Sequence, residues 1–228
     1  MKNVIIIIKK QLKDTLKNKT VLIQFILFPI LTLIMENAIK MDGMPELFFT
    51  KLFSIMYIGM APLTSTASII SEEKEKNTLK VLTMADVKPW QYLLGVGSYV
   101  WIICMAGAGI MATGFSGDEI TFYMVIMAAG FIISIVAGAC VGIYSKNQMT
   151  ATSVVMPVMM IFAFAPMLAM FNDKIERVAR FVFTQQLRSI LEEMTFDAVK
   201  SDALVILAVN ALIMIVLFFI SFKRKGLE

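Results

Sequence analysis

Two pairs of adjacent glutamates, Glu72–Glu73 and Glu192–Glu193, come closest in this sequence to a catalytic arrangement. A carboxylate pair inside a membrane can hold and activate a water molecule for peptide hydrolysis, but it needs further polar groups, commonly histidine. The chain contains no histidine, and both pairs lie in charged segments rather than within apolar blocks. The sequence therefore argues against an intramembrane glutamate protease.

Other site chemistry is limited in the same way. Without histidine, the chain lacks His-based acid–base catalysis, His metal sites and the Ser-His-Asp triad. Cys104 and Cys140 both lie inside apolar blocks, which indicates small core residues rather than disulfide or zinc ligands. The phosphate-binding pattern GxxxxGK(S/T) does not occur. We predict no catalytic residue, metal or cofactor in this chain. If ATP drives it, ATP and Mg are bound by a partner ATPase.

The elements that position the remaining polar residues are membrane spans. Hydrophobic residues make up 58% of the 228 residues and charged residues 17%, with a mean hydropathy of +0.79. About 20 apolar helical residues cross about 30 Å of hydrocarbon. Six blocks meet that length, at residues 21–39, 47–70, 92–114, 120–144, 151–171 and 203–222. The sequence predicts an all-α integral membrane protein with six transmembrane helices in a single transmembrane domain over 1–228.

A basic segment, residues 1–19, precedes the first span. Its apolar residues Val4, Ile7, Ile8 and Leu12 recur near the helical period, and six lysines lie among and beside them. This pattern predicts an amphipathic interfacial helix on the membrane surface, with its lysines near anionic lipid headgroups. The alternative is a solvated basic leader.

Lysine and arginine are unevenly divided between the segments that join the spans. If the N-terminus is cytoplasmic, the cytoplasmic segments hold 14 of the 21 basic residues, and the external segments hold 11 of the 17 acidic ones. The positive-inside rule then places both termini in the cytoplasm. We expect a multi-pass protein of a bacterial cell (plasma) membrane.

The predicted cytoplasmic segment 72–91 begins as a run of alternating acidic and basic residues that directly continues span two. Leu79 and Leu82 are three apart and can share one helical face. We expect the helix to end at Pro89 and Tyr92 to lie in an interfacial aromatic belt. The alternative is that the segment is a solvated connector whose charges only anchor span two.

The stretch ISEEKEKNTLKVLTMADVKPWQYLLG, from Ile70 to Gly95, resembles the signature of type-two ATP-binding-cassette (ABC-2 type) exporter permeases. In that family, span two leads into an acidic-basic-acidic run, a Thr-Leu-x-x-Leu stretch, a short turn and a Leu-Leu-Gly entry to span three. The amphipathic first helix, the six spans and a helical external segment at 172–202 extend the resemblance over the chain. Two positions depart from the pattern: Asn77 stands where Gly is usual, and Lys80 where an acid is usual.

The resemblance implies that the segment after span two packs on a cytoplasmic ATP-binding-cassette ATPase subunit, together with the first helix. Carried over by residue, it implies an ATPase-coupling surface of Glu72, Glu73, Glu75, Lys76, Thr78, Leu79 and Leu82. It also implies a second permease, as a homodimer or heterodimer. The segment 172–202 would dip into the outer leaflet as a lid, or form an ordinary surface helix.

Small and polar residues recur on one face of span two, at Ser54, Tyr57, Ala61, Ser65, Ser68 and Glu72. Such residues usually face other helices, and the sharper hypothesis is that they line a substrate path between two permease halves. Asn210 in span six is a further candidate for the path or for a helix interface. Gly138 and Gly142 in span four predict a helix contact. Glu36, near the outer end of span one, is either functional or simply reaches water.

We therefore expect the transmembrane subunit of an ATP-driven exporter that moves a hydrophobic or amphipathic substrate out of the cell by alternating access. An antimicrobial peptide, a drug or a lipid would fit, with a role in antimicrobial resistance. The expected partners are the ATPase, a second permease and membrane lipid, with no nucleic acid. The alternative is a membrane immunity or sensor protein that binds a toxin without transport, and such a protein would need no ATPase.

Overall fold

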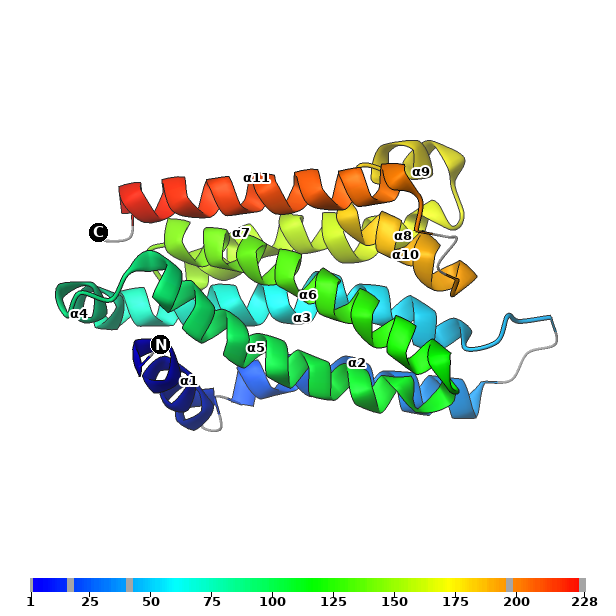
Figure 1. Cartoon of the computed structure of the whole chain (residues 1–228), viewed down its shortest axis with the longest axis horizontal. Helices are drawn as coiled ribbons and strands as arrows, with labels where there is room; N and C mark the ends of the chain where they lie inside the picture. The colour runs from blue at the N-terminus through cyan, green and yellow to red at the C-terminus, as the bar shows by residue number, and fades with distance from the viewer. Residues whose placement is uncertain (1, 16–18, 40–42, 196–198, 226–228) are drawn as a thin grey trace.

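The computed structural model describes residues 2–15, 19–39, 43–195 and 199–225, and over these ranges the chain is all-helical (Figure 1). The helices are α1 Lys2–Thr15, α2 Lys19–Ala38, α3 Phe48–Glu75, α4 Thr78–Met84, α5 Pro89–Met111, the 3-10 turn η1 Ala112–Gly114, α6 Asp118–Tyr144, α7 Gln148–Met159, the π-helical turn η2 Met160–Phe164, α8 Ala165–Ala169, α9 Asp173–Ala179, α10 Phe183–Glu193 and α11 Ser201–Lys225.

Among the described residues, six helical segments are long and apolar enough to cross a membrane. They are Val21–Ala38, Phe48–Glu75, Pro89–Gly114, Asp118–Tyr144, Gln148–Ala169 and Ser201–Arg224. The all-α, six-span fold predicted from the sequence is thereby confirmed. The second span differs from the prediction because α3 continues past residue 70 through the charged run.

The two ends of the bundle are built from different parts of the chain. Both termini lie at one end together with α4, whereas α8, α9 and α10 lie at the other (Figure 1). We call the first the terminal end, made of α1, residues 72–91 and the turn at 145–148. We call the second the distal end, made of residues 36–39, 43–51, 112–119 and 166–194.

Helix α3 is the centre of the bundle. Of the residues in its most apolar stretch, 72% are buried, against 11% in α11. It packs against α2, α5, α6 and α7, whereas α11 packs mainly on α6. The side chains that α11 leaves uncovered are mostly apolar, as expected for a helix that faces lipid. A movement of α3 would therefore reach most other spans directly.

The contact between α3 and α6 is closest where α6 has small residues. A Cβ atom on Gly138 would lie 2.4 Å from the Leu63 carbonyl oxygen, and one on Gly142 would lie 2.8 Å from Ile70 Cβ. The hydroxyl of Ser134 donates to the Ile58 carbonyl at 2.6 Å. The small residues of span four thus let two helices of the same chain approach closely.

The first helix, α1, packs on α5. Ile7 is buried, and a Cβ atom on Gly95 would lie 2.7 Å from its side chain, while Ile5 and Ile6 are exposed. Residues 16–18 of the predicted 1–19 helix lie outside the described residues, and Lys19 already belongs to α2.

Span five is interrupted, unlike the other five. Pro157 lies inside α7 and Pro166 at the start of α8, and the turn between them is π-helical. Proline lacks the N–H that a regular α-helix uses, so the ladder of hydrogen bonds changes register here. A Cβ atom on Gly59 of α3 would lie 2.7 Å from the nitrogen of Ala163, so α3 touches the backbone of this turn.

Candidate functional site

A buried carboxylate, Glu73, joins three helices at the terminal end. Its Oε1 atom accepts hydrogen bonds from Lys10 Nζ and, at 2.6 Å, from Gln11 Nε2 of α1, and Lys10 also forms an ion pair with it. Its Oε2 atom accepts from the Tyr92 hydroxyl of α5 at 2.5 Å. Both carboxylate oxygens are therefore used, which is the condition under which a buried charge is tolerated. The side chain of Glu73 locks α1 and α5 to the end of α3.

The neighbouring acids bind the start of α7. Glu75 Oε2 accepts from the backbone N–H of Gln148 at 3.1 Å, and Glu72 Oε2 accepts from the Gln148 side-chain amide at 3.0 Å. The first N–H groups of a helix lack partners within it, and negative charge there is favourable. Lys74 Nζ donates to the Ile143 carbonyl of α6 at 2.7 Å. The charged run of α3 therefore connects α1, α5, α6 and α7 to the end of one helix.

Lys76 follows the last residue of α3 and lies on the exposed surface. It pairs with Glu72 in the i,i+4 arrangement. The hydrogen bond to Glu72 and the charge of that carboxylate raise the pKa of Lys76. Lys76 therefore keeps its positive charge at the surface over the whole physiological pH range.

Asn77 makes the sharp turn from α3 to α4, with a left-handed φ of 57°. Glycine and, among the other residues, asparagine adopt this conformation most readily. The resembled family usually has glycine at this position, and asparagine here makes the same turn possible. The turn sets α4 back against the bundle, so that Leu79 is buried and Leu82 is half-buried.

The face of α4 that points away from the bundle carries exposed apolar side chains. Val81 and Met84 are 63% and 81% exposed, with Lys80 exposed beside them. Apolar side chains grouped on an exposed helix outside the spans indicate a protein contact. Of the residues predicted for coupling, Glu73 and Leu79 are buried within this chain. Glu75 and Lys76 are exposed, and Glu72, Thr78 and Leu82 are half-buried.

Two details of this region differ from the sequence predictions. Pro89 does not end a helix but begins α5, where its missing N–H costs nothing. Tyr92, which was expected in an interfacial belt, is buried and bonded to Glu73. Both differences arise because α4 ends earlier, at Met84, and a turn through Asp86 follows.

The polar stripe of α3 meets other helices over most of its length. The Ser54 hydroxyl bonds to the Tyr123 hydroxyl at 2.7 Å, and the Tyr57 hydroxyl donates to the Phe25 carbonyl at 3.1 Å. Ala61 is also buried. The structure therefore brings Ser54, Tyr57 and Ala61 into helix contacts inside one chain.

The lower part of the stripe opens onto a small polar cavity of about 210 Å³ between α2, α3 and α7. Ser65 donates to the Gln24 side chain at 3.1 Å, and Ser68 lines the cavity. Its other polar lining residues are Thr64, Gln148 and Thr152. Polar side chains inside spans normally face another helix or a water-filled space.

The two remaining intramembrane candidates hold chain segments in place. Glu36 Oε2 accepts from the N–H of Thr50 at 2.9 Å and from its hydroxyl at 3.1 Å, which caps the start of α3. Asn210 Nδ2 donates to the Phe181 carbonyl at 3.0 Å, which ties α11 to the turn before α10.

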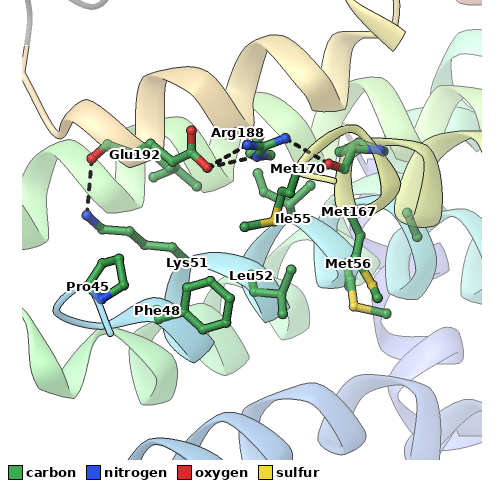
Figure 2. A pocket seen from close by; sticks show the side chains of 13 residues that line it. Pro45, Phe48, Lys51, Leu52, Ile55, Met56, Met167, Met170, Arg188 and Glu192 are labelled. Atoms are coloured by element: carbon green, nitrogen blue, oxygen red, sulfur yellow. Dashed lines mark hydrogen bonds and ion pairs between the residues drawn. The ribbon is translucent and has the colours of Figure 1, made fainter. Parts of the chain in front are cut away.

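The distal end holds an apolar cavity of about 300 Å³ between α3, α8 and α10 (Figure 2). Arg188 closes one side: Nη1 donates to the Pro166 carbonyl at 2.9 Å, and Nε donates to Glu192 at 2.9 Å. Lys51 Nζ donates to the Glu192 carbonyl at 3.2 Å. The walls are largely methionine and aliphatic side chains. They include Met56, Met167, Met170, Leu52, Ile55 and Leu191.

The segment 172–202 forms two short helices, α9 and α10, while residues 196–198 lie outside the described residues. Phe183, Leu187 and Ile190 of α10 are buried against the bundle. Helix α9, by contrast, exposes Val178. Helix α10 is therefore part of the packed distal end rather than a detached surface helix.

Sequence reasoning missed the residues that give each end its character. The partners of Glu73 are more than 60 residues away in α1 and 19 residues away in α5. The spacing places Val81 and Met84 away from the face shared by Leu79 and Leu82, but it does not say which of the two faces is exposed. Among the described residues, no group of three or more Cys, Asp or Glu side chains could hold a metal ion.

Comparison with known families gives a match that covers nearly the whole chain. A family model described as "ABC-2 family transporter protein" matches residues 2–223. Among curated proteins, the search found no match. The match includes α1, all six spans, the charged run of α3 and the cavity at the distal end.

Proposed function

The chain belongs to the ABC-2 family of transporter membrane proteins, and from this premise we propose that it is the membrane subunit of an ATP-driven exporter. A separate ATP-binding-cassette chain would bind ATP and Mg and hydrolyse the nucleotide. The terminal end would lie in the cytoplasm and the distal end outside, in a bacterial plasma membrane. The transported substrate would be hydrophobic or amphipathic.

The observation that carries this proposal is the continuity of α3 from its buried span into the charged run at the terminal end. A helix of 28 residues has no flexible joint between its buried span and Glu75, so a push at its end is not absorbed in a loop. Glu72, Glu73 and Glu75 tie the same end to α1, α5 and α7. A force applied there would move several spans together, as alternating access requires.

The ATPase would dock on α4. The exposed pair Val81 and Met84 offers an apolar contact, and Lys76 and Lys80 offer positive charge beside it. Glu73 and Leu79 would contribute by fixing α1 and α4 to α3 rather than by touching the partner. This assignment keeps the coupling region implied by the resemblance and changes which of its side chains form the contact.

A second permease would cover the side of the bundle formed by α2 and α7. In each of these two spans, only 28% of the residues in the most apolar stretch are buried. The polar cavity at Ser68 and Thr152 lies between them and α3, and Ser153 of α7 is exposed. Polar groups are costly against lipid even where, like Thr152 and Ser153, they donate to carbonyls of their own helix, so a second chain there, as a homodimer or heterodimer, would cover them or enclose water.

Co-purification tests the proposal. The tagged chain is expressed with its neighbouring open reading frames and extracted in mild detergent, and the retained proteins are assayed for ATP hydrolysis. We expect the wild-type chain to retain an ATPase and the Val81→Asp, Met84→Asp variant to lose it, because both carboxylates would be buried in the contact.

The matched control places the same change at the other end. Val178 and Phe181 are also exposed apolar residues, and the Val178→Asp, Phe181→Asp variant should retain the ATPase. If the wild-type chain retains no ATPase, the exporter proposal fails and a toxin-binding immunity or sensor protein becomes the better account. If both double variants retain it, the exporter proposal stands and the docking site on α4 is wrong.

A further inference from the structure

The apolar cavity at the distal end borders a larger, polar opening. The opening has a volume of about 960 Å³ and lies between the end of α2, the start of α3 and the end of α10. Cavity and opening share the lining residues Pro45, Lys51 and Glu192. A molecule could therefore occupy both at once, with an apolar part in the cavity and a polar part in the opening.

The opening is strongly acidic. Its described lining residues include one base, Lys51, and five acids, Glu36, Glu46, Glu119, Glu192 and Glu193. Glu46 and Glu193 line the opening and are exposed, so their side chains are in contact with solvent there. Several like charges around one concave space attract counter-ions of the opposite sign.

The cavity itself is suited to apolar groups of varied shape. Its volume of about 300 Å³ lies at the lower limit for small-molecule sites, about 300 Å³. Met56, Met167 and Met170 line it (Figure 2), and methionine is flexible enough to repack around different contents. At its edge, Arg188 pairs with the Glu192 carboxylate, whereas Lys51 donates only to the Glu192 main-chain carbonyl and keeps its charge.

We propose that the distal cavity binds a cationic amphiphile, with its apolar body between α3, α8 and α10 and its positive charge in the acidic opening. The inference rests on the proposed function, because it names the class of substrate that an exporter of this kind would release at its outer end. With Glu192 paired to Arg188, an anionic amphiphile would place its charge against three surplus glutamates, which the charge balance of the opening disfavours.

Binding of two amphiphiles with the same apolar chain and head groups of opposite charge tests the proposal. The full-length chain is purified in detergent, and binding of decyltrimethylammonium is measured by equilibrium dialysis, with decanesulfonate as the anionic counterpart. We expect saturable binding of the cation that weakens as salt is added, because the attraction is screened. The two ions partition differently into micelles, so each is compared between wild type and variant rather than with the other.

Two kinds of variant separate charge from volume. Glu46→Gln with Glu193→Gln should weaken cation binding about three- to tenfold and should not weaken anion binding. Met167→Trp should fill the cavity and abolish the binding of both ions. Glu176→Gln removes an exposed acid on α9 outside the opening and should change nothing. Gel filtration shows whether each variant is folded, and the glutamine variants keep the test valid if the tryptophan variant is not.

The proposal is overturned if cation binding is unchanged in the double glutamine variant, or if it persists in a folded Met167→Trp variant. It is also overturned if the anion alone binds and Lys51→Gln weakens that binding, since the cavity would then hold an anionic amphiphile such as a lipid. These results do not depend on an ATPase. Cation binding without a co-purifying ATPase would support the site and contradict the exporter, and the reverse result would do the opposite.

Discussion

Acidic residues stand at both ends of α3, but they are used in opposite ways. At the terminal end, Glu72, Glu73 and Glu75 accept hydrogen bonds from α1, α5 and α7 and draw four helices together. At the distal end, acids such as Glu46 and Glu193 surround an opening. The same side-chain type therefore makes one end rigid and leaves the other end open to a ligand.

The difference indicates that the two ends of α3 have different roles. A closed, charge-bonded end can receive a push without deforming, while an open end with a methionine-lined cavity can change its contents and shape. The close contact between α3 and α6 joins the two. Changes at each end, and in the contact between them, should therefore have different consequences.

The largest effect is expected at the terminal end. Glu73→Ala leaves the buried Tyr92 hydroxyl and the Lys10 ammonium without their common partner, so the free energy of unfolding should fall by about 3 kcal/mol. Thermal unfolding in detergent measures the loss, and limited proteolysis shows whether α1 detaches. Glu73→Gln, which still accepts from Tyr92, should lose less.

The matched change at the distal end sharpens the contrast. Glu193→Gln alters an exposed acid and should change stability by less than about 0.5 kcal/mol. Equal losses for Glu73→Ala and Glu193→Gln would contradict the assignment of structural work to one end and ligand attraction to the other.

A smaller effect is expected where α3 and α6 cross. The Cβ of Gly138→Ala would lie 2.4 Å from a backbone oxygen of α3, so the helices must move apart. Overpacking of this kind should cost about 2 kcal/mol, measured by thermal unfolding. Gly109→Ala is the control, because a Cβ there meets nothing within 4 Å, and it should cause no loss.

A smaller loss than that of Gly138→Ala is expected at the turn into α4. Asn77 has a left-handed φ, so Asn77→Gly should keep or raise stability by a few tenths of a kcal/mol, whereas Asn77→Ala should lower it by about 1 kcal/mol. Both are measured by thermal unfolding. A loss for the glycine variant equal to that for alanine would show that the asparagine side chain, rather than its backbone conformation, matters there.

The spans could be predicted because blocks of about 20 apolar residues are visible in the sequence alone. The continuation of span two into the charged run was also expected, but its end at Glu75 was not, because the left-handed turn at Asn77 leaves no mark in the hydropathy. Charged residues stop an apolar block without stopping a helix, and here their partners come from other helices.

The sites were less accessible to sequence reasoning than the fold. The shared face of Leu79 and Leu82 was visible, but only the turn at Asn77 decides that this face points inward and that Val81 points outward. The bonds of Glu73 and the distal cavity join residues far apart in the chain. Such contacts depend on how the helices pack, and local spacing does not carry that information.

The central claim is that the two ends lie on opposite sides of the membrane, with α4 in the cytoplasm. The two native cysteines, Cys104 and Cys140, are first replaced by alanine. Single cysteines are then introduced at two exposed positions, as Met84→Cys on α4 and Val178→Cys on α9. Intact cells are then treated with a membrane-impermeant maleimide. The account predicts labelling at position 178 in intact cells, and at position 84 only after the membrane is permeabilised. Labelling of position 84 in intact cells would contradict it.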